Sequence, residues 1–108
     1  TKDKRLIMRI IVLFNLKDGV DPAAYEAWAR QSDIPGVNAL GSVTRFTVHK
    51  ATGLFGSDAP SPYQYVEVID IAGMDGFVAD ITTPEFQAMA APFQQFADNP
   101  QFILTEDL

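Results

Sequence analysis

The stretch Tyr63-Gln64-Tyr65-Val66-Glu67-Val68-Ile69-Asp70-Ile71 decides how this chain folds. It is rich in β-branched and aromatic residues and lies between the turn-forming residues Pro62 and Gly73, so we predict a strand. Because side chains alternate along a strand, one face holds Gln64, Val66, Val68 and Asp70, and the other holds Tyr63, Tyr65, Glu67, Ile69 and Ile71. We expect the first face to pack under helices. The second face, with its carboxylate and phenols, is then expected to line a cavity.

Further strands are predicted on both sides of this stretch. Leu6–Leu16 is a nearly continuous apolar run, typical of a central strand that is covered on both faces. Val43–Lys50 alternates between polar and apolar residues, and Gln101–Leu108 is the last predicted strand. The intervening Ala51–Pro62 is a long loop with Gly and Pro residues, a type that is often mobile or lid-like.

The first helix is predicted to begin with Asp21 as its N-cap and Pro22 at the first helical position. Its buried stripe consists of Tyr25, Trp28 and Ala29. We expect Asp33-Ile34-Pro35-Gly36 to break this helix and Val37–Leu40 to form a short second turn.

Two more helices are predicted in the second half of the chain. Met74–Ile81 forms a short one, and the next has Thr83 as its cap and Pro84 at its first position. Pro92 should kink or split that helix, and Asn99-Pro100 should end it.

The resulting order, strand, helix, strand, strand, helices, strand, is the split βαβ pattern of a ferredoxin-like fold. The prediction is an α+β domain with one four-stranded antiparallel sheet and helices on one face. An uncovered apolar face invites association, so a second copy should close a dimeric α/β barrel. Residues 8–108 form this single domain, and residues 1–7 are expected to be a leader or a cloning remnant before Met8.

Composition narrows the range of functions. The 108 residues are 47% hydrophobic and 20% charged, as in an ordinary globular domain. A formal net charge of -6 with eight Lys and Arg argues against nucleic acid as a partner. The absence of Cys excludes disulfides and thiolate chemistry and is compatible with a cytoplasmic location. The apolar run near the start is too short to span a membrane.

Several segments carry a family resemblance. Met8–Lys17, Ile34–Val43 and the helix start Thr83-Pro84-Glu85-Phe86 resemble the dimeric α/β-barrel superfamily. Ala51–Val68 and Phe96–Leu108 look most like its RedY-like HapK branch. That resemblance implies a role in the biosynthesis of prodigiosin-type pyrrole pigments. Relatives in the superfamily include cofactor-free monooxygenases, polyketide cyclases, lactone isomerases and haem enzymes.

One departure from the superfamily concerns the polyketide cyclases. Their catalytic His before the helix-starting Pro corresponds here to Thr83, and their first-strand His corresponds to Arg9. The acid/base residues of those cyclases are therefore absent as such from this chain.

Glu67 is the leading candidate for a functional group. A carboxylate enclosed in a cavity has a raised pKa, as a general acid or base requires. The alternative is a structural ion pair, with Arg45 directly opposite on the next strand or with Arg9. We expect Glu67 to lie within hydrogen-bonding reach of Arg9, Arg45 or Tyr65. The face with Val66 should be dry.

The other candidates also have two interpretations each. His49 either exchanges protons near neutral pH or is simply exposed. Tyr25 and Trp28 either form a cavity wall or fill the core. The candidate catalytic residues are Glu67, His49 and Arg9. The candidate ligand-binding residues are Ile11, Leu13, Asn15, Tyr25, Trp28, Arg45, Tyr63, Tyr65 and Phe86.

The residues give no metal-ligand spacing and no phosphate-binding motif, so we expect no metal and no cofactor. Haem binding through His49 is the weakest alternative. The leading hypothesis is a cofactor-free enzyme that condenses, cyclises or isomerises an aromatic or pyrrolic intermediate. The alternative is a non-catalytic binding or carrier module for such an intermediate. The expected partners are a second copy of the chain and the small ligand.

Overall fold

A computed structural model describes residues 8–108, and the predicted leader at residues 1–7 lies outside the described residues. In chain order the elements are β1 (Met8–Leu16), α1 (Pro22–Trp28), a π-helical turn (Ala29–Asp33), α2 (Ile34–Asn38), β2 (Val43–Lys50), β3 (Tyr65–Ile71), α3 (Met74–Ile81), α4 (Pro84–Phe96) and β4 (Ala97–Thr105).

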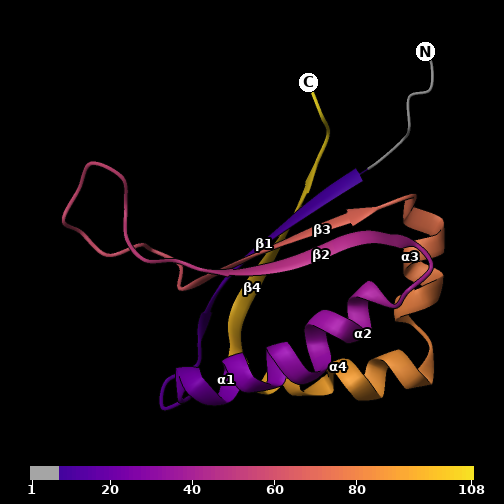
Figure 1. Cartoon of the computed structure of the whole chain (residues 1–108), viewed down its shortest axis with the longest axis horizontal. Helices are drawn as coiled ribbons and strands as arrows, with labels where there is room; N and C mark the ends of the chain where they lie inside the picture. Colours follow the sequence, from indigo (N-terminus) through magenta and orange to yellow (C-terminus); the bar gives the residue numbers. More distant parts are fainter. Residues whose placement is uncertain (1–7) are drawn as a thin grey trace.

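The strands form one antiparallel sheet in the order β2-β3-β1-β4, with β1 and β3 at its centre. The helices lie together on one side of this sheet (Figure 1). The predicted α+β, ferredoxin-like architecture is therefore confirmed. The loop between β2 and β3 extends away from the body of the molecule (Figure 1).

Aromatic side chains fill the core between the sheet and the helices. Phe14 of β1 is fully buried, and its ring centroid lies 5.5 Å from that of Tyr25 and 5.1 Å from that of Phe93. The apolar positions of β1 that alternate with Arg9 thus pack under α1 and α4, as expected for an amphipathic helix layer on a sheet.

The predicted break in the first helix is wrong. Asp33 and Ile34 keep helical backbone angles, φ −67°, ψ −53° and φ −60°, ψ −52°. The wide π-helical turn ends with the Ile34 N–H donating a hydrogen bond to the Ala29 carbonyl. Pro35 lies in the first turn of α2, where a backbone N–H would have no partner within the helix, so the proline costs no helical hydrogen bond. The helical path therefore continues, and a single buried stripe runs along it: Tyr25, Ala29, Asp33 and Val37.

Gly36 has a packing role in this helix. A Cβ added there would lie 2.6 Å from the Cε atom of Met89, closer than real contacts allow. The glycine lets α2 approach α4 closely.

The second half of the chain matches the prediction except near two prolines. Thr83 caps α4 through its hydroxyl, which accepts a hydrogen bond from the Phe86 N–H at 3.1 Å. Pro92 does not split α4, which runs without interruption to Phe96. β4 begins at Ala97, four positions before the predicted strand start. The turn-like Asn99-Pro100 does not precede the strand but forms a bulge within it, and Asn99 has a φ angle of 47° there.

The predicted orientation of β3 is also wrong. The face with Glu67 turns toward the helices, with the same-face pairs Ile10 with Ile69, Val12 with Glu67, and Phe14 with Tyr65. Val66 and Val68 lie on the other face and are half-buried instead of dry. We call that uncovered side the open face; its members on the three strands β1, β2 and β3 include Arg9, Ile11, Leu13, Asn15, Arg45, Thr47, His49, Val66, Val68 and Asp70.

Candidate functional site

A pocket of about 720 Å³ lies between the sheet and the helix layer. Most of the lining side chains are apolar, and both the sheet and the helix layer contribute them, for example Ile69 from β3, Phe77 from α3 and Phe86 from α4. Its polar side chains are Asp33, Glu67, Gln87 and Gln94. Such a mostly apolar pocket with a few polar groups is typical of small-molecule sites.

The exposed edge of the pocket, which we call its mouth, is formed mainly by residues of α4 and β4. Gln87 and Gln94 belong to its lining and are exposed. On the β4 side, Phe102 and Leu104 also line it and remain 57% and 62% exposed. The mouth thus combines two amides with two large apolar side chains.

Glu67 lies in the deep part of this site and is only 4% exposed. Burial raises the pKa of Glu67 to about 8, and the nearby charge of Asp33 adds to that rise. The Tyr25 hydroxyl donates a hydrogen bond to Glu67 Oε2 at 3.3 Å, which lowers the pKa slightly in opposition. At neutral pH the Glu67 carboxyl is therefore mostly protonated.

Asp33 is the second carboxyl on the pocket wall, and it is 6% exposed. Burial raises the pKa of Asp33 to about 7. Among residues 8–108, no side chain or backbone group makes a hydrogen bond or ion pair with the Asp33 carboxyl. The carboxyl is thus buried on the pocket wall and unpartnered.

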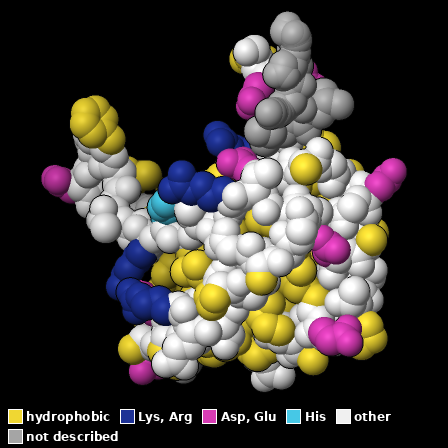
Figure 2. Space-filling model, turned by 45° about the vertical axis from the view of Figure 1, so that its right-hand side comes forward, with side chains coloured by type: hydrophobic (Ala, Val, Ile, Leu, Met, Phe, Trp, Pro, Cys, Tyr) yellow, Lys and Arg dark blue, Asp and Glu magenta, His cyan; other side chains and the backbone are white. Residues whose placement is uncertain are grey.

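No Lys, Arg or His from the described part of the chain belongs to the pocket lining. In Figure 2, Lys and Arg side chains gather to one side of the molecule, near the single His. Among the described residues, the pocket wall therefore holds two carboxyl groups and no cationic side chain.

The expected partners of Glu67 lie elsewhere. Arg9 binds Asp70 on the open face with two hydrogen bonds, 2.7 Å and 3.0 Å long. In the register of β2 with β3, Arg45 lies opposite Asp70, and Glu67 lies opposite Val48. The predicted contacts of Glu67 with Arg9, Arg45 and Tyr65 are therefore wrong, because the face assigned to β3 was inverted.

The aromatic candidates divide between pocket and core. Phe86 lines the pocket, and Tyr25 contacts Glu67. Tyr65 is buried on the helix-covered face, but its hydroxyl donates to Glu26 at 2.6 Å, outside the pocket lining. Trp28 is half-buried and packs on Tyr25, with their ring centroids 6.2 Å apart.

The remaining candidates do not line the pocket. Ile11 and Leu13 lie on the open face. Asn15 holds the long loop, since its side chain binds the Pro62 carbonyl at 3.0 Å and the Gln64 N–H at 2.9 Å. Tyr63 precedes β3 in the same loop.

His49 is exposed near the end of β2, also outside the pocket. Its Nε2 atom lies 2.9 Å from the hydroxyl of Thr47. The proton-exchange role suggested for His49 has no connection to the two pocket acids.

The sequence interpretation missed Asp33, the two glutamines at the mouth and the β4 side chains. A signal for Asp33 was present, because it follows Tyr25 and Ala29 at intervals of four residues. Continuing the helix through Pro35 would have placed it on the buried stripe.

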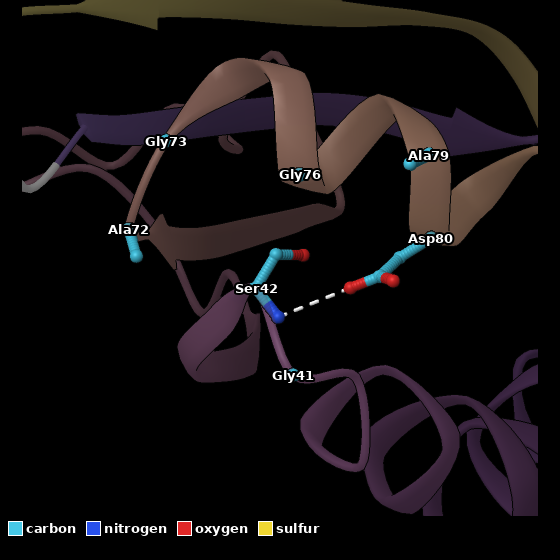
Figure 3. Close-up of a pocket in the computed structure, with 7 residues that line it drawn as sticks. All are labelled: Gly41, Ser42, Ala72, Gly73, Gly76, Ala79 and Asp80. Carbon is cyan, nitrogen blue, oxygen red and sulfur yellow. Dashed lines mark hydrogen bonds between the residues drawn. The ribbon is translucent and has the colours of Figure 1, made fainter.

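A second, shallower pocket of about 490 Å³ lies where the chain enters β2 beside α3 (Figure 3). Its wall includes Gly41, Ser42 and Asp80, and the Ser42 N–H donates to Asp80 Oδ2 at 3.0 Å (Figure 3). This contact fastens the loop to α3. The lining contains no second titratable group.

Within residues 8–108, no group of three or more His, Cys, Asp and Glu side chains is arranged to hold a metal ion. None of the helices in this described part is long and apolar enough to cross a membrane.

A family model described as REDY-like protein HapK matches residues 8–108. Among solved structures, HapK from Hahella chejuensis is 34% identical, with a TM-score of 0.76, and the match covers 94% of this chain and 92% of that one. A search of curated proteins found no significant match.

More distant structures share the fold. A dimeric ferredoxin-like protein of unknown function from Thermobifida fusca is 24% identical, with a TM-score of 0.68 and coverage of 94% and 91%. A protein from Arabidopsis thaliana is 18% identical, with a TM-score of 0.75 and coverage of 94% and 95%. The family match over almost the whole chain goes further than fold: this chain belongs to the REDY-like HapK family.

Proposed function

We propose that this protein acts in secondary-metabolite biosynthesis, where it binds an aromatic or pyrrolic intermediate in the helix-covered pocket. It condenses, cyclises or isomerises that intermediate by proton transfer, without a cofactor. The observation that carries this proposal is Glu67, a carboxyl that is 4% exposed on the wall of an otherwise mostly apolar pocket.

The two pocket acids suit proton transfer near neutral pH. General acids and bases work best when their pKa lies close to the working pH. With pKa values of about 8 for Glu67 and about 7 for Asp33, the first is mostly protonated and the second partly ionised at pH 7 to 7.5. Glu67 then donates a proton and Asp33 accepts one.

The rest of the pocket suits a flat, apolar ligand. Phe77, Phe86 and Phe93 contribute to its wall, and aromatic faces pack well on conjugated rings. The amides of Gln87 and Gln94 offer hydrogen bonds at the mouth.

We propose that the working unit is a homodimer that pairs the two open faces. Ile11, Val66 and Val68 are only half-buried there, and no helix of the described chain covers them. An apolar sheet face of this kind favours association in water. The pocket lies on the helix-covered side of the sheet, opposite the proposed interface, so each subunit would carry a site.

A binding or carrier role is the second candidate. It is favoured by the exposed Phe102 and Leu104 at the mouth, which suit the transfer of an apolar ligand to another protein.

One comparison separates the two roles. In a strain of the source organism that lacks the chromosomal copy, the wild-type gene, Glu67→Gln and Asp70→Asn are expressed in turn, and metabolites are followed by mass spectrometry. Asp70→Asn is the matched control, because it makes the same change on the opposite face of β3.

We expect Glu67→Gln to lower the rate of product formation by on the order of 100-fold or more, since general acid–base catalysis contributes about that much. Its unchanged substrate should accumulate, while Asp70→Asn keeps near wild-type output. Full product formation by a folded Glu67→Gln variant would contradict catalysis and favour the carrier role.

A further inference from the structure

Two carboxyl groups lie on the pocket wall, and no Lys, Arg or His among residues 8–108 lines the pocket with them. Asp33 from the π-helical turn and Glu67 from β3 both lie on its wall, at 6% and 4% exposure. Beneath them, α1 contributes Tyr25, which contacts Glu67. The lining residues from β2, α3, α4 and β4 include no titratable side chain.

Unpaired buried carboxyls are unfavourable when they ionise, and proteins usually place a cation or several hydrogen-bond donors beside them. The open face shows that this chain does so elsewhere, because Asp70 there has Arg9 as a bidentate partner. Asp33, in contrast, has no hydrogen-bond partner among the described residues. The missing partner is therefore expected to come with the ligand.

The side chains that line the pocket also indicate what kind of positively charged ligand could pair with the two acids. Hard divalent metals take six or more oxygen ligands, or keep several waters, and this pocket offers two carboxyls among apolar side chains. An organic cation on an aromatic frame satisfies both parts of the wall, because its charge meets the acids and its rings meet the phenylalanines.

We propose that the pocket selects ligands in which an aromatic frame carries a basic nitrogen, held as its protonated form between Asp33 and Glu67. This proposal rests on the pocket named under the proposed function, but it concerns binding alone. A neutral base enters the pocket, the Glu67 carboxyl gives its proton to the nitrogen, and the resulting N–H cation pairs with the carboxylate. Release reverses the transfer.

A matched set of probes tests this charge preference. Biphenyl-4-carboxamidine is a cation, biphenyl-4-carboxamide is its neutral counterpart, and biphenyl-4-carboxylate is an anion of the same shape. Their dissociation constants for the purified protein are measured by isothermal titration calorimetry at pH 6, 7.5 and 9.

At pH 9 we expect the amidine to bind at least roughly tenfold more tightly than the amide, and the carboxylate to bind least, because the acids are then ionised. Lowering the pH to 6 protonates both acids, so the amidine should lose roughly tenfold or more in affinity. The neutral amide should change by less than about threefold over the same range.

The variants locate the effect. Asp33→Asn and Glu67→Gln should each reduce the preference for the amidine, and the double variant should abolish it. The exposed acid Asp75, outside the pocket, supplies the control Asp75→Asn, which should keep the preference.

Equal binding of all three probes, or a preference that survives in the folded double variant, would overturn the inference. If the three probes bind equally, but a bulky substitution in the pocket wall prevents their binding, the charge preference is wrong and the pocket remains a ligand site. Conversely, a clear amidine preference together with full product formation by Glu67→Gln in cells would support this inference and contradict catalysis.

Discussion

The two faces of β3 treat a carboxylate in opposite ways. On the open face, two hydrogen bonds from Arg9 lower the pKa of Asp70. Three residues earlier, on the helix-covered face, burial raises the pKa of Glu67 to about 8. Asp70, which Arg9 holds, contributes to structure. Glu67 has no cationic partner among the described residues and keeps a proton that it can exchange near neutral pH. Surroundings, more than residue type, decide which carboxyl is available for chemistry.

The largest expected effect is a change with pH in the free energy of unfolding, caused by Glu67 on the helix-covered face. Between about pH 4.5 and pH 8 the unfolded chain releases the Glu67 proton while the folded chain retains it, so the free energy of unfolding should fall as pH rises. At about 1.4 kcal/mol per pKa unit, the Glu67 contribution lost between these two pH values is on the order of 5 kcal/mol. Urea unfolding at a fixed protein concentration measures this loss.

Glu67→Gln is the variant that sharpens this test. The glutamine side chain has no ionisable proton. The variant should therefore lack most of the decrease in the free energy of unfolding that Glu67 causes between pH 4.5 and pH 8, and it should be more stable than the wild type at pH 9. The raised pKa of Asp33 leaves a residual slope in the same direction. Equal slopes for the wild type and Glu67→Gln would contradict a buried, protonated Glu67.

The next effect concerns the open face. Val68→Asp places a charge at the centre of the proposed dimer interface, next to Ile11 and Thr47 in the sheet. Burying an unpaired charge there costs about 3 kcal/mol or more, which raises the dimer dissociation constant by roughly 100-fold. Sedimentation velocity at micromolar concentration measures the change. Gln87→Asp at the pocket mouth is the control, and a wild-type chain that sediments as a stable monomer would contradict the proposed dimer.

The smallest effect comes from the paired acid. Asp70→Asn removes the partner of Arg9, and partly exposed ion pairs contribute about 1 kcal/mol or less. The pKa of Asp70 is lowered in the folded state, so the destabilisation should be present at neutral pH and disappear as pH falls below the range of ordinary carboxyls. Its pH dependence is thus opposite in sign to that of Glu67. Thermal unfolding at pH 7 and pH 2.5 distinguishes the two.

Much of the architecture followed from local sequence signals. The alternation in Val43–Lys50 and the cap formed by Thr83 and Pro84 predicted β2 and the start of α4 correctly. Proline was harder to interpret, because its effect depends on the surrounding backbone. Pro35 follows a π-helical turn and Pro92 stays inside a helix, so neither ends its element.

The candidate site was predicted only in part. Alternation correctly separated Glu67 from Val68, but it says which residues share a face and not which face the helices cover. Both faces of β3 are rich in apolar residues, so composition did not resolve the choice. The pair of Arg9 with Asp70 held the missing information, because opposite charges on neighbouring strands favour one register over another. Asp33 was missed because the sequence prediction ended the first helix at this residue, whereas the helical path continues through it.

The titration of Glu67 tests most directly whether this buried carboxyl is protonated at neutral pH. Carbon-13 NMR of protein labelled at the glutamate side-chain carboxyl follows each Glu resonance from pH 3 to pH 10, and Glu67→Gln identifies the signal of Glu67 by its loss. We predict a titration midpoint near pH 8 for that signal. A midpoint between about pH 4 and 5, the range of an ordinary glutamate, would contradict it.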